Sequence, residues 1–136
     1  MRWNRDSQRS MVGTKKVKGV EMDYLLVAIG GGLGAILRFS LGKWIVERLG
    51  ASFPYGTFVI NITGSFLLGF TLFMGEGIHL FFNMGFLGAF TTFSTFSYEG
   101  FTLMEKGQYV RSILYVIGSA FLGIVGAYLG MEVYLW

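Results

Sequence analysis

The stretch "GFLGAFTTFSTFS", residues 85–97, decides how this chain is built. It places four Phe, three Thr, two Ser and two Gly among thirteen residues and carries no charge. On one continuous helix, Phe90, Phe93 and Phe96 would share a face and the hydroxyl residues would occupy the adjoining face. The two glycines that precede the Thr pair each weaken a helix by about 1 kcal/mol relative to Ala. The segment therefore predicts a helix that is interrupted near the Thr pair.

The rest of the chain is apolar enough to place this segment in a membrane. Of the 136 residues, 53% are hydrophobic and only 14% are charged. A bilayer core about 30 Å thick requires roughly 20 apolar residues in a helix. The uncharged runs predict an all-α membrane protein whose four spans cover about residues 23–46, 52–75, 78–99 and 111–132. We expect one four-helix transmembrane domain over residues 22–136, in a multi-pass protein of the cell inner membrane.

The first 21 residues differ from the rest of the chain. They hold six of the eleven Lys and Arg residues and show no apolar period. They do not resemble a signal peptide, because no apolar stretch precedes a small-residue cleavage site. We expect residues 1–21 to form a basic, disordered tail, and Met22 offers a second possible start of the working protein.

Charge counting bears on the orientation of the chain in the membrane. The five Lys and Arg residues beyond the tail all fall on one predicted side of the membrane, and the six in the tail fall on the other. The positive-inside rule then predicts a definite orientation without the tail and almost none with it. A chain without orientation bias could insert both ways and pair antiparallel.

Two predicted helices carry lines of polar or small residues at four-residue spacing. The line on the second helix consists of Thr57, Asn61, Ser65 and Gly69, and the line on the fourth includes Tyr115, Ser119 and Gly123. An Asn within the membrane either bonds to a neighbouring helix, at about 0.6–2 kcal/mol, or lines an aqueous path. The residues alone leave both interpretations open.

Composition excludes several other functions. The absence of cysteine excludes disulfides, thiolate chemistry and zinc–sulfur sites, and a dispersed net charge of +3 does not indicate a nucleic-acid partner. The single histidine, His79, has no base–nucleophile arrangement around it, so we expect no enzyme activity. A drug/proton antiporter would need a carboxylate within the membrane. All the acidic residues beyond the tail lie at or outside the predicted span ends: Asp23, Glu47, Glu76, Glu99, Glu105 and Glu132. A non-conducting structural subunit remains the other alternative, but it would give the aligned Asn and hydroxyl groups no purpose.

Three motifs resemble the CrcB/Fluc family of fluoride channels: "GAILR" at 34–38, "GTFVINITGSFLLG" at 56–69 and "GFLGAFTTFSTFS" at 85–97. The resemblance covers about residues 23–131. It implies a fluoride-selective channel that lets fluoride leave the cytoplasm passively. It also implies a dual-topology homodimer with antiparallel subunits, two anion pores and a sodium ion at the dimer centre.

The resemblance implies roles for particular residues. Phe93 and Phe96 would point ring edges at the permeating ion, and Arg38 would gather anions at a vestibule. The full set of implied pore residues is Phe93, Phe96, Asn61, Ser94, Thr95, Thr57, Tyr115, Ser119 and Arg38. Backbone carbonyls of Gly88 and Thr91, from both subunits, would coordinate sodium, since carbonyl oxygens suit a hard cation.

The chain departs from the family pattern at two positions. Ala89 stands where the family often has Gly, and Gly123 stands where some members carry another hydroxyl. The second departure leaves the extent of the hydroxyl line on the fourth helix open.

Passage of fluoride would explain why residues 85–97 combine hydroxyl groups with Phe rings. A pore must replace the ion's water shell with hydrogen-bond donors while holding the ion weakly enough for exit. Hydroxyl and amide groups supply donors, and Phe ring edges supply weak positive potential without a charge. A row of neutral sites therefore suits passage of a small anion.

Overall fold

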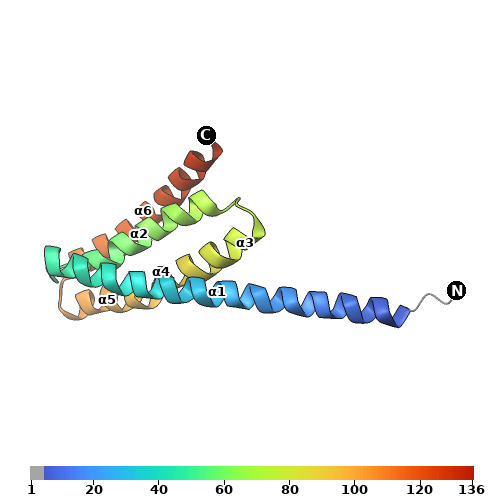
Figure 1. The fold of residues 1–136 in the computed structure, drawn as a ribbon. Helices are drawn as coiled ribbons and strands as arrows, with labels where there is room; N and C mark the ends of the chain where they lie inside the picture. The colour runs from blue at the N-terminus through green and yellow to red at the C-terminus, as the bar shows by residue number, and fades with distance from the viewer. Residues whose placement is uncertain (1–4) are drawn as a thin grey trace.

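A computed structural model describes the backbone of residues 5–136 and the side chains from residue 19 onward. The described residues form helices and no strands, which confirms the all-α class (Figure 1). In chain order the elements are α1 (Arg5–Leu49), α2 (Tyr55–Thr71), α3 (Glu76–Ile78), η1 (His79–Leu87), α4 (Gly88–Phe90), α5 (Phe93–Glu105) and α6 (Tyr109–Leu135).

Helix α1 begins earlier than the sequence predicts. Residues 5–21, which we expected to be disordered, continue the first predicted span as one helix of 45 residues. The segment contains no proline and several good helix formers, so nothing in it stops the helix. A helix of this length measures about 68 Å, more than twice the bilayer core. Its N-terminal part projects away from the other helices (Figure 1).

Two described helices are long and apolar enough to cross a bilayer. They are Gly19–Leu49 and Tyr109–Leu135, each of which contains an 18-residue stretch whose mean hydropathy is 1.7 and 1.9, respectively. Helix α2 has 17 residues, and residues 76–105 are divided among α3, η1, α4 and α5. The four predicted spans as a set therefore stay a prediction.

The backbone changes from helical to extended within residues 85–97. The nine-residue η1 is a π-helix, a rare form that often lies near functional sites. Helix α4 ends at Phe90, and Thr91 (ψ 157°) and Thr92 (φ −147°, ψ 117°) are extended before α5 begins at Phe93. Phe90 is buried at 2% exposure, whereas Phe93 is 80% exposed. The three Phe side chains thus do not share one face, because the helix on which that prediction rested is not continuous.

Glycines let the helices approach closely. A Cβ at Gly30 or Gly34 of α1 would collide with backbone carbonyl oxygens of Phe81 and Phe86 in η1. Close packing of this kind holds membrane helices together, because lipid removes the hydrophobic drive between them. The buried core beside this contact consists of Ile60, Leu87 and Phe90.

Helices α2 and α6 meet in the same way. A Cβ at Gly69 would collide with the carbonyl oxygen of Ala127, and a Cβ at Gly130 would collide with that of Phe66. The two backbones are therefore in contact along this part of the helix pair, which lies side by side in Figure 1.

Candidate functional site

Asn61 of α2 holds the extended residues between α4 and α5. Its Nδ2 donates to the carbonyl oxygen of Thr92 at 3.0 Å, and its Oδ1 accepts from the Thr92 N–H at 2.9 Å. Thr92 is buried, at 7% exposure. A buried backbone group without a partner would cost about 1–3 kcal/mol. The amide of Asn61 thus takes over both backbone bonds that an interrupted helix leaves open.

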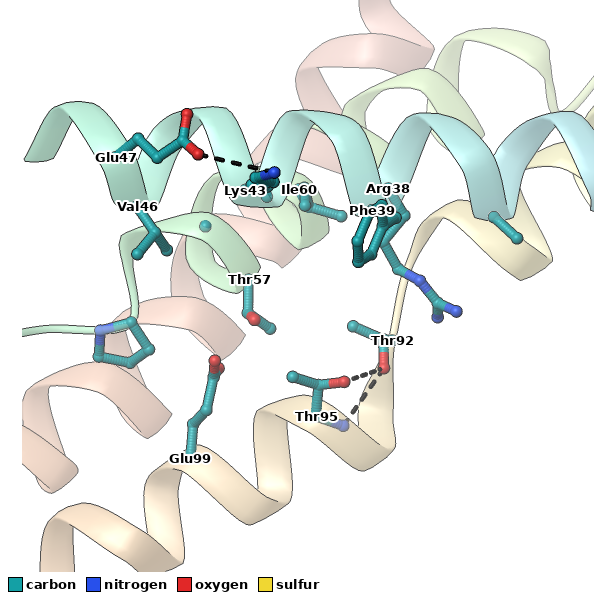
Figure 2. Close-up of a pocket in the computed structure, with 14 residues that line it drawn as sticks. Arg38, Phe39, Lys43, Val46, Glu47, Thr57, Ile60, Thr92, Thr95 and Glu99 are labelled. Carbon is teal, nitrogen blue, oxygen red and sulfur yellow. Dashed lines mark hydrogen bonds and ion pairs between the residues drawn. The ribbon is translucent and has the colours of Figure 1, made fainter. Parts of the chain in front are cut away.

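Thr92 in turn begins α5. Its Oγ1 accepts from the Thr95 N–H at 3.2 Å and donates to Thr95 Oγ1 at 3.0 Å (Figure 2). The Ser94 Oγ lies 3.4 Å from the same Thr92 Oγ1. A Thr at the N-cap satisfies an N–H of the first turn that has no helical partner. The hydroxyls of Thr92, Ser94 and Thr95 therefore gather at the start of α5.

The same bonds release two carbonyl oxygens. In a continuous α-helix the Gly88 carbonyl would accept from the Thr92 N–H and the Thr91 carbonyl from the Thr95 N–H. Both N–H groups are taken, by Asn61 and by the Thr92 side chain. Carbonyl oxygens without helical partners can coordinate a hard cation. The residues predicted to bind sodium, Gly88 and Thr91, thus have the ligand chemistry required.

No acidic alternative for a metal occurs in the described part of the chain. Those residues contain no group of three His, Cys, Asp or Glu side chains that could hold a metal ion. The predicted ligands at Gly88 and Thr91 are backbone carbonyl oxygens, which the absence of such side-chain groups does not test.

A cavity of about 450 Å³ lies between α1, α2 and α5 (Figure 2). It brings together three predicted pore residues, Arg38, Thr57 and Thr95, with Thr92 and Glu99. Arg38 is half-buried, and Thr57 is buried at 8% exposure. The lining is mainly apolar, and its charged side chains also include Lys43 and Glu47. The role of Arg38 in an anion vestibule stays a prediction.

Glu99 is a residue whose place the sequence analysis misjudged. We expected it at or outside a span end, but it is half-buried in the middle of α5 and lines the cavity. Its Oε2 accepts a hydrogen bond from the Tyr115 hydroxyl at 2.8 Å. Its spacing of three residues from Phe96 could have placed it on the same helix face.

Aromatic rings surround Tyr115, which is fully buried. The ring centroids of Phe96 and Tyr115 lie 5.2 Å apart, and those of Phe93 and Phe96 lie 6.0 Å apart at an angle of 41°. Phe53 packs edge-on against Tyr115 at 5.6 Å. The structure thus groups Phe93, Phe96 and Tyr115 as neighbours and leaves the Phe93 ring 80% exposed.

Ser119 has a buried hydroxyl that forms no hydrogen bond. Its exposure is 9%, and its Oγ is the buried side-chain atom of the described residues that lacks a partner. A serine within a helix commonly bonds back to the carbonyl four residues earlier. Here that bond is not made, so the Ser119 hydroxyl is available to another group.

A second cavity, of about 220 Å³, lies where α2 meets the interrupted segment. Its lining includes Asn61 and Ser65 from α2 and Asn83, Gly88 and Thr91 from the third region. Asn83 was not singled out from the sequence, although an Asn within an apolar run is itself a signal. Its Nδ2 donates to the Thr71 carbonyl at 3.3 Å, and its Oδ1 accepts from the Thr71 hydroxyl, which ties η1 to the end of α2.

Comparisons with known proteins cover the same residues. A family model described as "CrcB-like protein, Camphor Resistance" matches residues 25–131. A protein of Clostridium acetobutylicum named fluoride-specific ion channel FluC 2 is 49% identical over 111 residues, covering 80% of this chain and 95% of the relative. Proteins named fluoride-specific ion channel FluC from Acidobacterium capsulatum and Thermus thermophilus are 48% and 49% identical. Each match covers 82% of this chain, and 95% and 92% of the respective relative.

Proposed function

The chain belongs to the CrcB-like family, and from this premise we propose that it is a fluoride-selective ion channel. It lies in the membrane as a multi-pass protein and lets fluoride leave the cytoplasm passively. As a channel it catalyses no chemical reaction.

The observation that carries the proposal is the clustering of neutral donors around the interrupted third segment. Thr57 and Thr95 line the same cavity as Arg38, and the buried Ser119 hydroxyl has no hydrogen-bond partner. Neutral donors can replace the water shell of a small anion without the deep trap that a buried cation would create. The Phe93 and Phe96 rings can add the weak positive potential of their edges.

The working unit that we propose is an antiparallel homodimer of four-span subunits. The spans are α1, α2, the region from α3 to α5, and α6, with the interruption at Thr91 and Thr92 at membrane depth. Extended backbone is tolerated there only where protein or water covers it, and the Asn61 amide covers Thr92. Phe93 is 80% exposed in the protomer, so a partner subunit could complete the pore wall around its ring.

A sodium ion at the dimer centre is part of this proposal. The carbonyl oxygens of Gly88 and Thr91 are free of their helical donors, as described above. Two carbonyls from one subunit are too few for a hard cation, whereas four from an antiparallel pair approach a complete shell. The ion, when bound, would supply positive charge that links the two chains.

Fluoride efflux from liposomes tests the proposal directly. The purified protein is reconstituted, and efflux is read with a fluoride electrode, with chloride efflux as the control. We expect rapid fluoride efflux, negligible chloride efflux and strongly reduced fluoride efflux in Asn61→Ala and Phe93→Ala variants that still assemble. The absence of fluoride efflux from a well-folded dimer would reject the channel.

The same vesicles distinguish a channel from a proton-coupled antiporter. The half-buried Glu99 is the residue that could carry a proton in an antiporter. An imposed proton gradient should not drive fluoride uphill if the protein is a passive channel. Uphill movement that disappears in Glu99→Gln would favour the antiporter instead.

A further inference from the structure

Ser65 is not among the predicted pore residues. It lies one turn after Asn61 on α2 and is half-buried. On α6, the line of hydroxyls that includes Tyr115 and Ser119 ends at Gly123, which has no side chain. At the level of Gly123, α6 therefore offers no side chain to the proposed pore.

The geometry around Gly123 gives an answer. A Cβ built at Gly123 would lie 3.4 Å from the Ser65 Oγ, which is the one atom within 4 Å of it outside the neighbouring backbone of α6. The hydroxyl of Ser65 therefore points across the α2–α6 contact at the place where a side chain on α6 is missing. One turn earlier on α6, the Ser119 hydroxyl is buried and has no partner.

The surroundings of Ser65 show where a path could continue. Beyond it, the backbones of α2 and α6 are in contact at Gly69 and Gly130, which leaves no space between the helices. On its other side, Ser65 lines the 220 Å³ cavity with Asn61, Asn83 and Thr91. Ser65 thus stands between the closed part of the α2–α6 contact and a polar cavity.

We propose that Ser65 is a further pore residue, whose hydroxyl donates to the passing anion at the level of Gly123. The inference rests on the proposed channel function. It assigns the donor at this level to α2, on the wall of the 220 Å³ cavity beside the interrupted segment.

The primary test compares Ser65→Ala with the wild type in fluoride efflux from liposomes. Because hydrogen bonds to charged groups are among the stronger ones, removing this donor should slow efflux about tenfold or more. The matched control is Thr63→Ala, which removes an exposed hydroxyl two residues away on the same helix and should leave efflux unchanged. Wild-type rates from Ser65→Ala would overturn the proposal.

A rescue separates donation from packing. In the double variant Ser65→Ala, Gly123→Ser, a hydroxyl returns to the same level from the opposite helix, into space that the Ser65 Oγ occupied. We expect efflux to recover at least several-fold relative to Ser65→Ala. If the double variant assembles as a dimer but stays as slow as Ser65→Ala, Ser65 acts by packing and the proposal is wrong.

Ser65→Cys serves if Ser65→Ala does not assemble. It keeps nearly the same shape but replaces the O–H with a weak S–H donor, and it should slow efflux while the dimer persists in size-exclusion chromatography. Wild-type efflux from Ser65→Cys would also overturn the proposal. The absence of fluoride efflux from wild-type liposomes would instead reject the channel function itself, and the wild-type control in the same assay shows this independently of Ser65.

Discussion

The side-chain amide of Asn61 forms both available hydrogen bonds with the backbone of Thr92, 31 residues further along the chain. It acts as a substitute for the helical partners that Thr92 has lost. The break between α4 and α5 is therefore stabilised by a single side chain from a neighbouring helix, and the hydroxyls that follow depend on it for their position.

Asn61→Ala tests this relationship. It would leave the Thr92 N–H and carbonyl without partners, at a cost of about 1–3 kcal/mol for each buried group. We expect a lower thermal midpoint in detergent together with strongly reduced fluoride efflux. Thr63→Ala, on the exposed side of α2, is the matched control. An unchanged midpoint in Asn61→Ala would mean that the amide does not support the break.

Truncation of Phe90 should lower the stability of the protein, whereas truncation of Phe93 should lower fluoride efflux. Phe90→Ala removes a ring that is 2% exposed and should destabilise the protein by about 3–5 kcal/mol. Phe93→Ala removes a ring that is 80% exposed, so the protomer fold should persist while fluoride efflux falls about tenfold, equivalent to 1.4 kcal/mol in the barrier. Denaturant unfolding and efflux, measured on both variants, check the contrast. Equal destabilisation by both would contradict it.

Arg38→Gln should reduce fluoride efflux more at low salt than at high salt. The reason is that the half-buried guanidinium in the 450 Å³ cavity attracts anions, over a screening length that falls from about 30 Å at 0.01 M to about 8 Å at 0.15 M. Initial efflux rates at the two ionic strengths give the comparison. Arg111→Gln is the control, because Arg111 bonds to Ser52 and Gln108 outside this cavity. If Arg38→Gln and Arg111→Gln showed the same salt dependence, Arg38 would not attract fluoride more than another surface arginine does.

Deletion of residues 1–21 should change membrane orientation. With the segment, Lys and Arg number six on one predicted side and five on the other; without it, all five remaining lie on one side. The positive-inside rule then predicts mixed insertion for the full chain and one dominant orientation for the shortened chain. Reporter fusions at the C-terminus measure the ratio. A variant with the six tail cations replaced by Gln should behave like the deletion, and mixed insertion of both variants would refute the charge argument.

Replacement of sodium should loosen the proposed dimer. If the carbonyls of Gly88 and Thr91 from both subunits hold the ion, a bulky organic cation cannot take its place. We expect the dimer to dissociate more readily when sodium is exchanged for N-methylglucamine at constant ionic strength, as measured by subunit exchange of labelled chains. Identical exchange rates in the two solutions would count against a central sodium ion.

The amino-acid sequence by itself determined the class of this protein and the segments that matter. Uncharged runs of about 20 residues indicate membrane helices, because a helix of that length spans the bilayer core and satisfies its backbone within one segment. The residues of 85–97 also carry their own signal of interruption, since glycines and paired Thr residues disfavour a continuous helix. The Asn61 line could be found from its four-residue spacing, because spacing along a helix is a local property.

Only the tertiary structure decided which partners these residues have. The alternatives left open for Asn61 depended on what α2 packs against, and the partner proved to be the Thr92 backbone. The split between buried Phe90 and exposed Phe93 depended on where the helix stops, and the place of Glu99 in the cavity wall depended on how packing against α6 sets α5 across the cavity from α1 and α2. These contacts join residues far apart in the chain, so no local pattern of spacing or composition encodes them.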